Sequence, residues 1–411
     1  MRELQERIMK ILFYRYGNIC EPDIIEAFQK VNIEVTEERT EMTIKKLPPS
    51  KQIDLLQKQI DACAPGDPFL FLFSVNYFPA IAEFCHVMQI PYVCWTVDSP
   101  VLELFSNSIR YDTNFIFLFD YAQYMYFHPQ NPDHIFYLPL ATNVHRWDRV
   151  LSMQNEGFSA KSCPYSSLQE DISFVGSLYT EKCKYNNLTL SSYTEGFLSG
   201  LMEAQLRLFG DNIVERSLPL EIVEEIKRAD HHFFFSGNTF ANPDTYVVAH
   251  DYLGYKVAET ERIRTLNLLA ERFQVSLYTR SDTSPLKGVT LKGGVQTLTE
   301  MPFVFSGSKI NLNITLRAIQ TGLSLRVYDI MGCGGFLMTN YQAELPEYFE
   351  IGKDLEAYGS PEELIDKCSF YLNHPKERTA IAKRGYEKVK CYHTYDSRIN
   401  SMIVELGKHL S

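Results

Sequence analysis

The segment SLRVYDIMGCGGF (residues 324–336) holds residue types that could bind a phosphorylated ligand. A charged pair, Arg326 and Asp329, stands immediately before a run of three glycines: Gly332, Gly334 and Gly335. Glycine permits positive φ and lets a ligand approach the main chain, and a helix N-terminus beside such a loop can bind phosphate. The spacing is neither G-x-G-x-x-G nor G-x-x-x-x-G-K-[ST]. The segment therefore suggests a nucleotide or phosphate site that follows neither of these fingerprints.

Length and composition limit the kind of protein that carries this segment. A chain of 411 residues predicts two domains. No apolar run reaches the roughly 18–20 residues of a membrane span, and residues 1–17 lack the features of a secretion signal. The nine cysteines form no C-x-x-C pair, which favours free thiols in a reducing compartment. A net charge of -11 argues against a nucleic-acid partner. We expect a cytoplasmic protein without a membrane span.

Short apolar runs alternate with longer amphipathic stretches, which predicts βαβ units and mostly parallel sheets. Strands are expected in two groups, at 9–14, 32–36, 69–75, 92–97, 115–120 and 135–140, and then at 171–178, 274–279, 309–315 and 334–339. Helices are expected between and after them, at 21–31, 79–88, 360–372 and 375–390. Ligands of such sheets bind at the carboxyl ends of the strands.

These groups predict an α/β protein with two Rossmann-like doubly wound domains that face a cleft. We assign residues 1–155 to the first domain and 156–390 to the second. A polar stretch at 153–170 resembles a linker, and residues 391–411 form a C-terminal helix. Residues 185–255 do not follow the βα rhythm and predict a helical insertion in the second domain.

Two long segments carry a resemblance to a known family. Residues 308–395 resemble the C-terminal half of the CgeB-like spore maturation glycosyltransferases, and residues 74–100, with FIFLFD and YLPLATN after them, resemble the N-terminal half. That family is similar to the group 1 glycosyltransferases with the GT-B fold. The resemblance implies a nucleotide-sugar donor, with UDP-sugar favoured, an acceptor on a protein or glycan, no separate cofactor and no bound metal.

The resemblance also assigns roles to residues of the donor side. Asp329 takes the place of the carboxylate that holds the ribose hydroxyls, and Gly332, Gly334 and Gly335 would let a helix N-terminus approach the phosphates. The alternative is that Asp329 caps a helix and the glycines only permit close packing. The group's first glutamate, eight residues earlier, is Thr321 here.

The group's phosphate-binding arginine is also replaced in this chain. Its V-G-R-L strand end reads Val175, Gly176, Ser177 and Leu178, while Lys182 falls where the group has a lysine. The missing cation could be Arg317 or Arg326, because a guanidinium gives paired hydrogen bonds to a diphosphate and stabilises it as it leaves. Lys309 is a third candidate, and a surface salt bridge explains it equally well. Further contacts to sugar or phosphate are expected from residues at strand ends: Asn313, Thr339, Asn340, Glu344, Ser281 and Asp282.

Two residues of the first domain are candidates for the acceptor side. Asn76 follows the strand at 69–75, and Asp98 follows the strand at 92–97. An acceptor hydroxyl needs a proton acceptor within hydrogen-bond reach, so Asp98 is the candidate general base. A turn residue before Ser-Pro is the alternative for Asp98, as turn formation is for Ser281 and Asp282.

Three classes of function fit these features. The first is a glycosyltransferase that moves a sugar to an acceptor hydroxyl, with inversion or retention left open. The second is a GT-B-like nucleotide-sugar epimerase, and the third is a binding protein that holds a nucleotide sugar without turnover. The changes at Thr321 and Ser177 are what keep the third class open.

Overall fold

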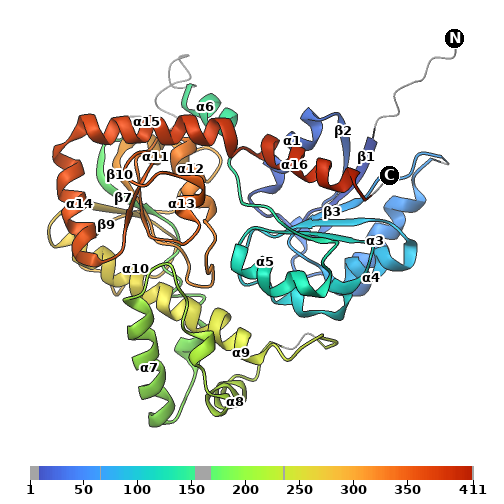
Figure 1. The fold of residues 1–411 in the computed structure, drawn as a ribbon, viewed down its shortest axis with the longest axis horizontal. Helices are drawn as coiled ribbons and strands as arrows, with labels where there is room; N and C mark the ends of the chain where they lie inside the picture. The colour runs from blue at the N-terminus through green and yellow to red at the C-terminus, as the bar shows by residue number, and fades with distance from the viewer. Residues whose placement is uncertain (1–8, 65, 153–167, 235–236, 410–411) are drawn as a thin grey trace. The chain divides into compact units, whose positions relative to one another are not determined.

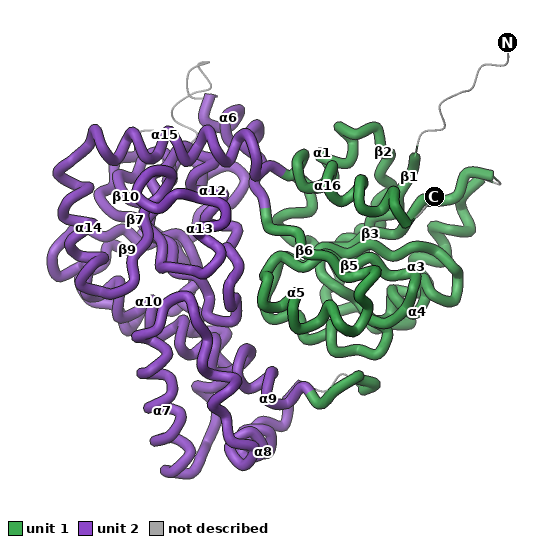
Figure 2. Tube along the Cα trace, in the orientation of Figure 1, with its two compact units in different colours: residues 1–140, 236–242, 395–411 green, residues 141–235, 243–394 purple. Residues whose placement is uncertain are grey.

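A computed structural model of the protein describes residues 9–64, 66–152, 168–234 and 237–409. The chain forms two compact units, shown in different colours in Figure 2. Unit 1 comprises residues 1–140, 236–242 and 395–411, and unit 2 comprises residues 141–235 and 243–394. The last helix therefore packs in unit 1, together with a short segment from the middle of the chain. Most of the expected linker, residues 153–167, lies outside the described residues.

Unit 1 contains a sheet of six parallel strands in the order β2-β1-β3-β4-β5-β6. Its central strands are apolar and covered on both faces, as parallel sheets require, and every residue of β4 is buried. The strands are β1 (Met9–Tyr14), β2 (Ile33–Glu38), β3 (Leu72–Val75), β4 (Tyr92–Trp95), β5 (Asn114–Leu118) and β6 (Ile135–Tyr137).

Helices cover both faces of the unit 1 sheet. On one face α1 and α16 lie side by side, and α3, α4 and α5 cover the other face (Figure 1). These helices are α1 (Glu21–Lys30), α3 (Pro49–Asp61), α4 (Pro79–Met88), α5 (Tyr121–Phe127) and α16 (Tyr395–Gly407). The chain passes from β1 to β2 on one side and then places β3 on the other side of β1. The strand order therefore reverses between β1 and β3, and the carboxyl ends at such a reversal are where sheets of this kind bind ligands.

Unit 2 contains a second sheet of six parallel strands, in the order β12-β11-β10-β7-β8-β9, and its order reverses between β7 and β10. Its strands are β7 (Glu170–Val175), β8 (Val275–Tyr278), β9 (Thr290–Gly293), β10 (Ser308–Asn313), β11 (Leu337–Asn340) and β12 (Glu356–Tyr358). The sequence prediction missed β9 and β12. The first is an exposed edge strand that reads TLKG, and the second has three residues, so neither shows a long apolar run.

Helices surround this sheet and fill the connection from β7 to β8 (Figure 1). Within the described residues that connection contains helices and loops but no strand. Its main helices are α7 (Ser192–Leu206), α8 (Leu220–Ala229), α9 (Asp244–Val247) and α10 (Gly254–Ala270). The later helices are α11 (Met301–Gly307), α12 (Leu325–Gly332), α13 (Leu345–Tyr348), α14 (Pro361–Asn373) and α15 (Pro375–Tyr392).

The glycine run ends a helix instead of beginning one. The backbone N–H of Gly335 donates to the carbonyl of Ile330, and that of Gly334 to the carbonyl of Met331, both at 2.9 Å. Gly334 has a φ of +71°, so these bonds form a Schellman motif at the C-terminus of α12. Because α12 connects two parallel strands, its last turn lies at the amino edge of the sheet, away from the ligand-binding edge.

The third glycine of the run is required by packing. A Cβ atom on Gly335 would lie 2.8 Å from the carbonyl oxygen of Phe305 and from the side-chain nitrogen of Asn311. Close packing, which was the alternative interpretation of the glycines, therefore accounts for this position.

This packing predicts a stability effect. Gly335→Ala should lower the free energy of unfolding by about 1–3 kcal/mol, because backbone atoms must move to admit the methyl group. Gly200→Ala is the control, since nothing lies within 4 Å of its added Cβ and alanine is the better helix former. Thermal melting of both variants tests this, and a Gly335→Ala melting temperature at or above that of the control contradicts the packing argument.

Candidate active site

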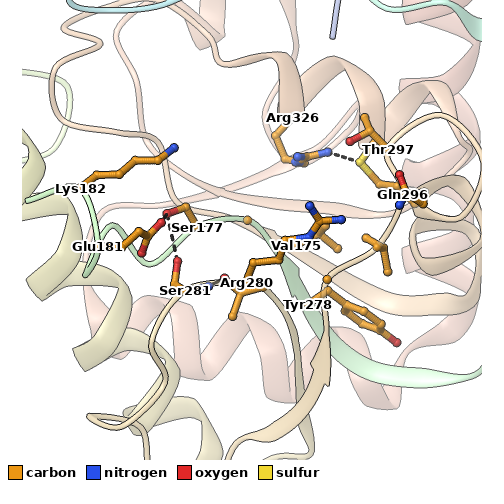
Figure 3. A pocket seen from close by; sticks show the side chains of 15 residues that line it. Val175, Ser177, Glu181, Lys182, Tyr278, Arg280, Ser281, Gln296, Thr297 and Arg326 are labelled. Carbon is orange, nitrogen blue, oxygen red and sulfur yellow. Dashed lines mark hydrogen bonds between the residues drawn. The ribbon is translucent and has the colours of Figure 1, made fainter. Parts of the chain in front are cut away.

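A cavity of about 360 Å³ lies in unit 2 at the carboxyl ends of β7, β8 and β9. Its walls come from the loops that follow these strands and from the starts of α11 and α12. The residues that line it are Val175, Gly176, Ser177, Glu181, Lys182, Tyr278, Thr279, Arg280, Ser281, Gly294, Val295, Gln296, Thr297, Met301 and Arg326. Figure 3 shows these side chains. Four of the predicted donor-site residues, Gly176, Ser177, Lys182 and Ser281, are brought together here with the predicted cation Arg326.

Three cationic side chains line this cavity, and two of them have no carboxylate partner. The side chains of Lys182 and Arg280 form no hydrogen bond or ion pair with any residue in the described part of the chain. Among the described residues, the third cation, Arg326, has one carboxylate partner, Asp329, at 3.7 Å. Positive charge in the cavity is thus only weakly compensated, which favours an anionic ligand.

Arg326 is held in place by the helix that carries it and by its neighbour α11. Its guanidinium donates to the sulfur of Met301 and lies 5.3 Å from the ring centroid of Phe305. Burial lowers the pKa of Arg326 below its ordinary value, and the nearby Asp329 carboxylate opposes that change. An arginine remains charged under such conditions, so a cation faces the cavity from the first turn of α12.

Asp329 lies behind Arg326 and is not part of the cavity lining. Asp329 is buried, with 7% of the residue exposed, and its carboxylate accepts a hydrogen bond of 2.7 Å from the hydroxyl of Thr142. The indole N–H of Trp147 donates to that same hydroxyl at 2.7 Å. Asp329 is therefore anchored inside unit 2, in the second turn of a helix whose first turn faces the cavity.

One carboxylate shares the cavity with the three cations. The hydroxyl of Ser177 donates to Glu181 at 3.0 Å, and a hydroxyl–hydroxyl bond of 3.1 Å joins Ser177 to Ser281. Partial burial raises the pKa of Glu181, but hydrogen bonds, including those from Ser281 and Ser177, outweigh it and hold the pKa below its ordinary value. An ionised Glu181 suits a ligand that has hydroxyl groups as well as phosphates.

The other two predicted cations lie elsewhere in unit 2. Arg317 is 5% exposed and forms a two-fold ion pair with Glu261, at 2.8 and 2.7 Å, while also donating to the carbonyl of Leu208. Lys309 pairs with Asp171 at 2.6 Å, and both stand at the starts of their strands, at the amino edge of the sheet. The structure thus places only Arg326 of the three in the cavity.

The remaining predicted contacts of this half follow β8, β10 and β11 and are not among the residues that line the cavity. Thr339 accepts a bond from the buried Asn313 amide, and Asn340 accepts one from the backbone of Thr315. Asp282 is exposed and accepts hydrogen bonds from Ser284, which is the alternative turn interpretation.

Glu344 is buried beside Thr321, the position that the sequence resemblance aligns with the first glutamate of the group 1 enzymes. The hydroxyl of Thr321 donates to the Glu344 carboxylate at 2.7 Å, and the Glu344 backbone N–H donates to the Thr321 carbonyl at 3.2 Å. The Glu344 carboxylate is therefore hydrogen-bonded to Thr321, the residue that stands in place of the expected glutamate.

In unit 1, Asn76 and Asp98 are brought together at the carboxyl ends of β3 and β4. The Asn76 amide nitrogen donates to the exposed Asp98 carboxylate at 2.7 Å. The Asn76 oxygen accepts from the backbone N–H of Val97 at 2.9 Å, which fixes the orientation of the amide. Asp98 is therefore positioned by Asn76 and faces solvent, as a general base would need to.

Sequence reasoning missed six polar residues of the cavity lining: Glu181, Tyr278, Thr279, Arg280, Gln296 and Thr297. Arg280 follows β8 by two residues, so the rule that ligands bind at carboxyl ends of strands could have found it. Gln296 and Thr297 follow β9, which was not predicted as a strand, and no signal pointed to them.

Comparison with known proteins supports this description of the chain. Residues 261–403 match the family model described as glycosyl transferase-like, which covers less than half of the chain. A comparison with curated proteins finds no sequence match. Within the described residues, no helix is both long and apolar enough to cross a membrane.

Several solved structures are similar across the whole chain. Anabaena HepE in complex with UDP-glucose has 10% identity and a TM-score of 0.51, with 97% of this chain and 100% of that chain covered. Sucrose-phosphate synthase from Thermosynechococcus elongatus has 11% identity and a TM-score of 0.50, with 97% and 99% covered. The chain therefore has the GT-B fold, which confirms the predicted fold class, and residues 261–403 match a glycosyl transferase-like domain model.

The two arginines should respond differently to substitution. Arg317→Ala leaves the Glu261 carboxylate buried without its partner, so the free energy of unfolding should fall by about 3–5 kcal/mol. Arg326→Ala removes the longer ion pair to Asp329 and the contacts with Met301 and Phe305, but this side chain is partly exposed at a cavity and leaves no closely paired carboxylate behind, so the substitution should cost less. Denaturant unfolding of both variants measures the difference, and equal losses would contradict the placement of Arg317 as a structural residue.

Proposed function

We propose that the protein is a CgeB-like glycosyltransferase that transfers a sugar from a UDP-sugar to a hydroxyl group on a protein or glycan. The observation that carries the proposal is the set of weakly compensated cations, Lys182, Arg280 and Arg326, around one cavity at the carboxyl edge of the unit 2 sheet. A diphosphate carries the opposite charge and fits a cavity of this kind.

The diphosphate lies between Arg326 and the loop Gly176–Ser177 in this proposal. A guanidinium can bond to two phosphate oxygens at once, and the first turn of α12 adds backbone N–H groups near the same place. The cations act most strongly as the bond between the sugar and the diphosphate breaks, because negative charge then develops on the leaving group. Asp329 orients Arg326, and a bond from Asp329 to the ribose stays a prediction.

The choice of uridine and of a sugar ligand has separate support. HepE, which shares the fold, was solved with UDP-glucose, and we assign the same class of donor to this chain. Glu344 is proposed to accept hydrogen bonds from sugar hydroxyls, because Thr321 holds its carboxylate where the related group has a glutamate. We propose no role for a metal ion.

On the acceptor side, Asp98 accepts the proton of the attacking hydroxyl. The acceptor oxygen forms a bond to the anomeric carbon, the bond from that carbon to the diphosphate breaks, and UDP leaves with the electron pair. The stereochemistry of the transfer decides how strongly the rate depends on Asp98. An inverting enzyme needs a base on the face opposite the diphosphate, whereas in a retaining enzyme the leaving phosphate can take the proton.

Donor binding tests the cavity assignment. Arg326→Ala and Arg280→Ala should each weaken UDP binding by about tenfold to a hundredfold, since a charge-assisted hydrogen bond contributes about 1.5–3 kcal/mol. Lys309→Ala is the matched control because its cation lies at the amino edge of the sheet, and its affinity should equal that of the parent. Titration calorimetry with UDP, ADP and GDP measures this. Parent affinity in both arginine variants would place the nucleotide elsewhere.

The reaction itself tests the role of Asp98. Asp98→Asn keeps the size of the side chain but removes its basicity, so transfer by an inverting enzyme should fall by about 10² to 10⁴ with UDP affinity unchanged. The configuration of the product, determined by NMR, must agree with the rate. An inverted product from a fully active Asp98→Asn variant would return Asp98 to the role of a turn residue. An epimerised nucleotide sugar, or binding without any turnover, would replace the proposed reaction.

A further inference from the structure

Tyr16 lies at the reversal point of the unit 1 sheet, in the loop that follows β1. The carboxylate of Glu21 holds this loop by accepting hydrogen bonds from the backbone N–H groups of Tyr16 and Gly17, both at 3.0 Å. Arg15 pairs with the same carboxylate at 3.0 Å. The Tyr16 ring also packs edge-on against Phe78, with 5.6 Å between centroids. Backbone and ring are thus both fixed at a position where α/β sheets bind ligands.

Two side-chain amides fix the direction of the Tyr16 hydroxyl. The Asn76 amide nitrogen donates to the Tyr16 oxygen at 2.8 Å, and the Asn18 amide nitrogen donates to it at 2.9 Å. Neither amide can rotate by 180° without losing a hydrogen bond to its oxygen. The Asn76 oxygen accepts from Val97, and the Asn18 oxygen accepts from the backbone N–H of Cys20 at 3.0 Å.

The two amide bonds leave the hydroxyl hydrogen of Tyr16 for a ligand. A phenol oxygen that accepts two N–H groups has used its lone pairs, so its own O–H must point away from both donors. No residue of the described chain accepts that hydrogen. Burial, and then the charge of Asp98, raise the pKa of Tyr16, so the hydroxyl keeps its proton at neutral pH.

Asp98 lies beside this hydroxyl because both bond to the same nitrogen. The Asn76 amide nitrogen is 2.8 Å from the Tyr16 oxygen and 2.7 Å from the Asp98 carboxylate. Two atoms bonded to one nitrogen in this way lie within roughly 5.5 Å of each other, a gap that one small polar group can bridge. A fixed donor and a fixed acceptor thus stand side by side at the open edge of the sheet.

We propose that Tyr16 binds the acceptor, donating its hydrogen to the acceptor oxygen while Asp98 accepts the proton of that same oxygen. This inference rests on the proposed function and adds to it a second residue that binds the acceptor. The group must offer both a lone pair and a hydrogen, as a hydroxyl does and as a carboxylate or an ammonium group does not.

The atoms of the step balance without a further reagent. One lone pair of the acceptor oxygen forms the bond to the anomeric carbon, and the other accepts the Tyr16 hydrogen bond. The proton goes to Asp98, UDP takes the electron pair of the broken bond, and Tyr16 keeps its hydrogen. Tyr16 therefore orients the nucleophile and does not exchange a proton.

Water and azide, used as alternative acceptors, separate this role from a structural one. Water, like an acceptor hydroxyl, would accept the hydrogen bond of Tyr16 and lose its proton to Asp98. Azide has no proton to lose. The probe is UDP-glucose, with glucose and glucosyl azide measured as products. Tyr16→Phe should release glucose about tenfold more slowly, raise the ratio of glucosyl azide to glucose, and bind UDP-glucose like the parent.

Further variants make the result decisive. Tyr124→Phe, a half-buried tyrosine of α5 with no hydroxyl contact in the described chain, should behave as the parent. Asn18→Ser keeps an acceptor for the Cys20 N–H but removes one donor to Tyr16, so it should shift the product ratio in the same direction by less. Parent rates and ratios in both Tyr16→Phe and Asn18→Ser overturn the role of Tyr16. A parent protein that binds but never cleaves UDP-glucose overturns the proposed function, and this inference with it.

Discussion

The reversal of strand order in each parallel sheet is the constraint on which the rest of the structure depends. Parallel strands bring all their carboxyl ends to one edge, and a change in winding direction leaves two neighbouring ends without a connection above them. In unit 1 the reversal lies between β1 and β3, and in unit 2 between β7 and β10. The loops after these strands carry Tyr16 and Asn76 in one unit and Ser177 in the other, so the fold itself decides where polar side chains can meet a ligand.

Electrostatic pairing then separates structural cations from cations that can bind a ligand. Arg262, on α10, is buried and donates to the carbonyls of Ser177 and Ile314, so it joins the loops on both sides of the reversal point. The guanidinium of Arg317 is already paired with the carboxylate of Glu261. Arg280 has no such partner among the described residues, and Arg326 has only a longer one. Uncompensated cations beside a cavity lower the stability of the folded protein, and a bound diphosphate would supply the missing negative charge.

The sequence was most informative where local pattern decides structure. Ten of the twelve strands follow from apolar runs, and Ser177, Lys182, Ser281 and Arg326 follow from position relative to strands or from resemblance. Ion pairs between residues far apart in the chain could not be predicted from the sequence. Glu261 lies 56 positions before Arg317, so nothing near that arginine showed that it was occupied. The glycine run misled because a Schellman motif and a phosphate loop both need glycine, and only the hydrogen bonds tell them apart.

The central claim is that a diphosphate occupies the cavity between Arg326 and the loop after β7. A crystal structure of the protein grown with UDP measures this directly. We predict phosphate oxygens within about 3 Å of the Arg326 guanidinium and of the Gly176–Ser177 backbone. A nucleotide bound outside this cavity, or inside it with Arg326 still turned to Met301 and no cation on the phosphates, would contradict the account.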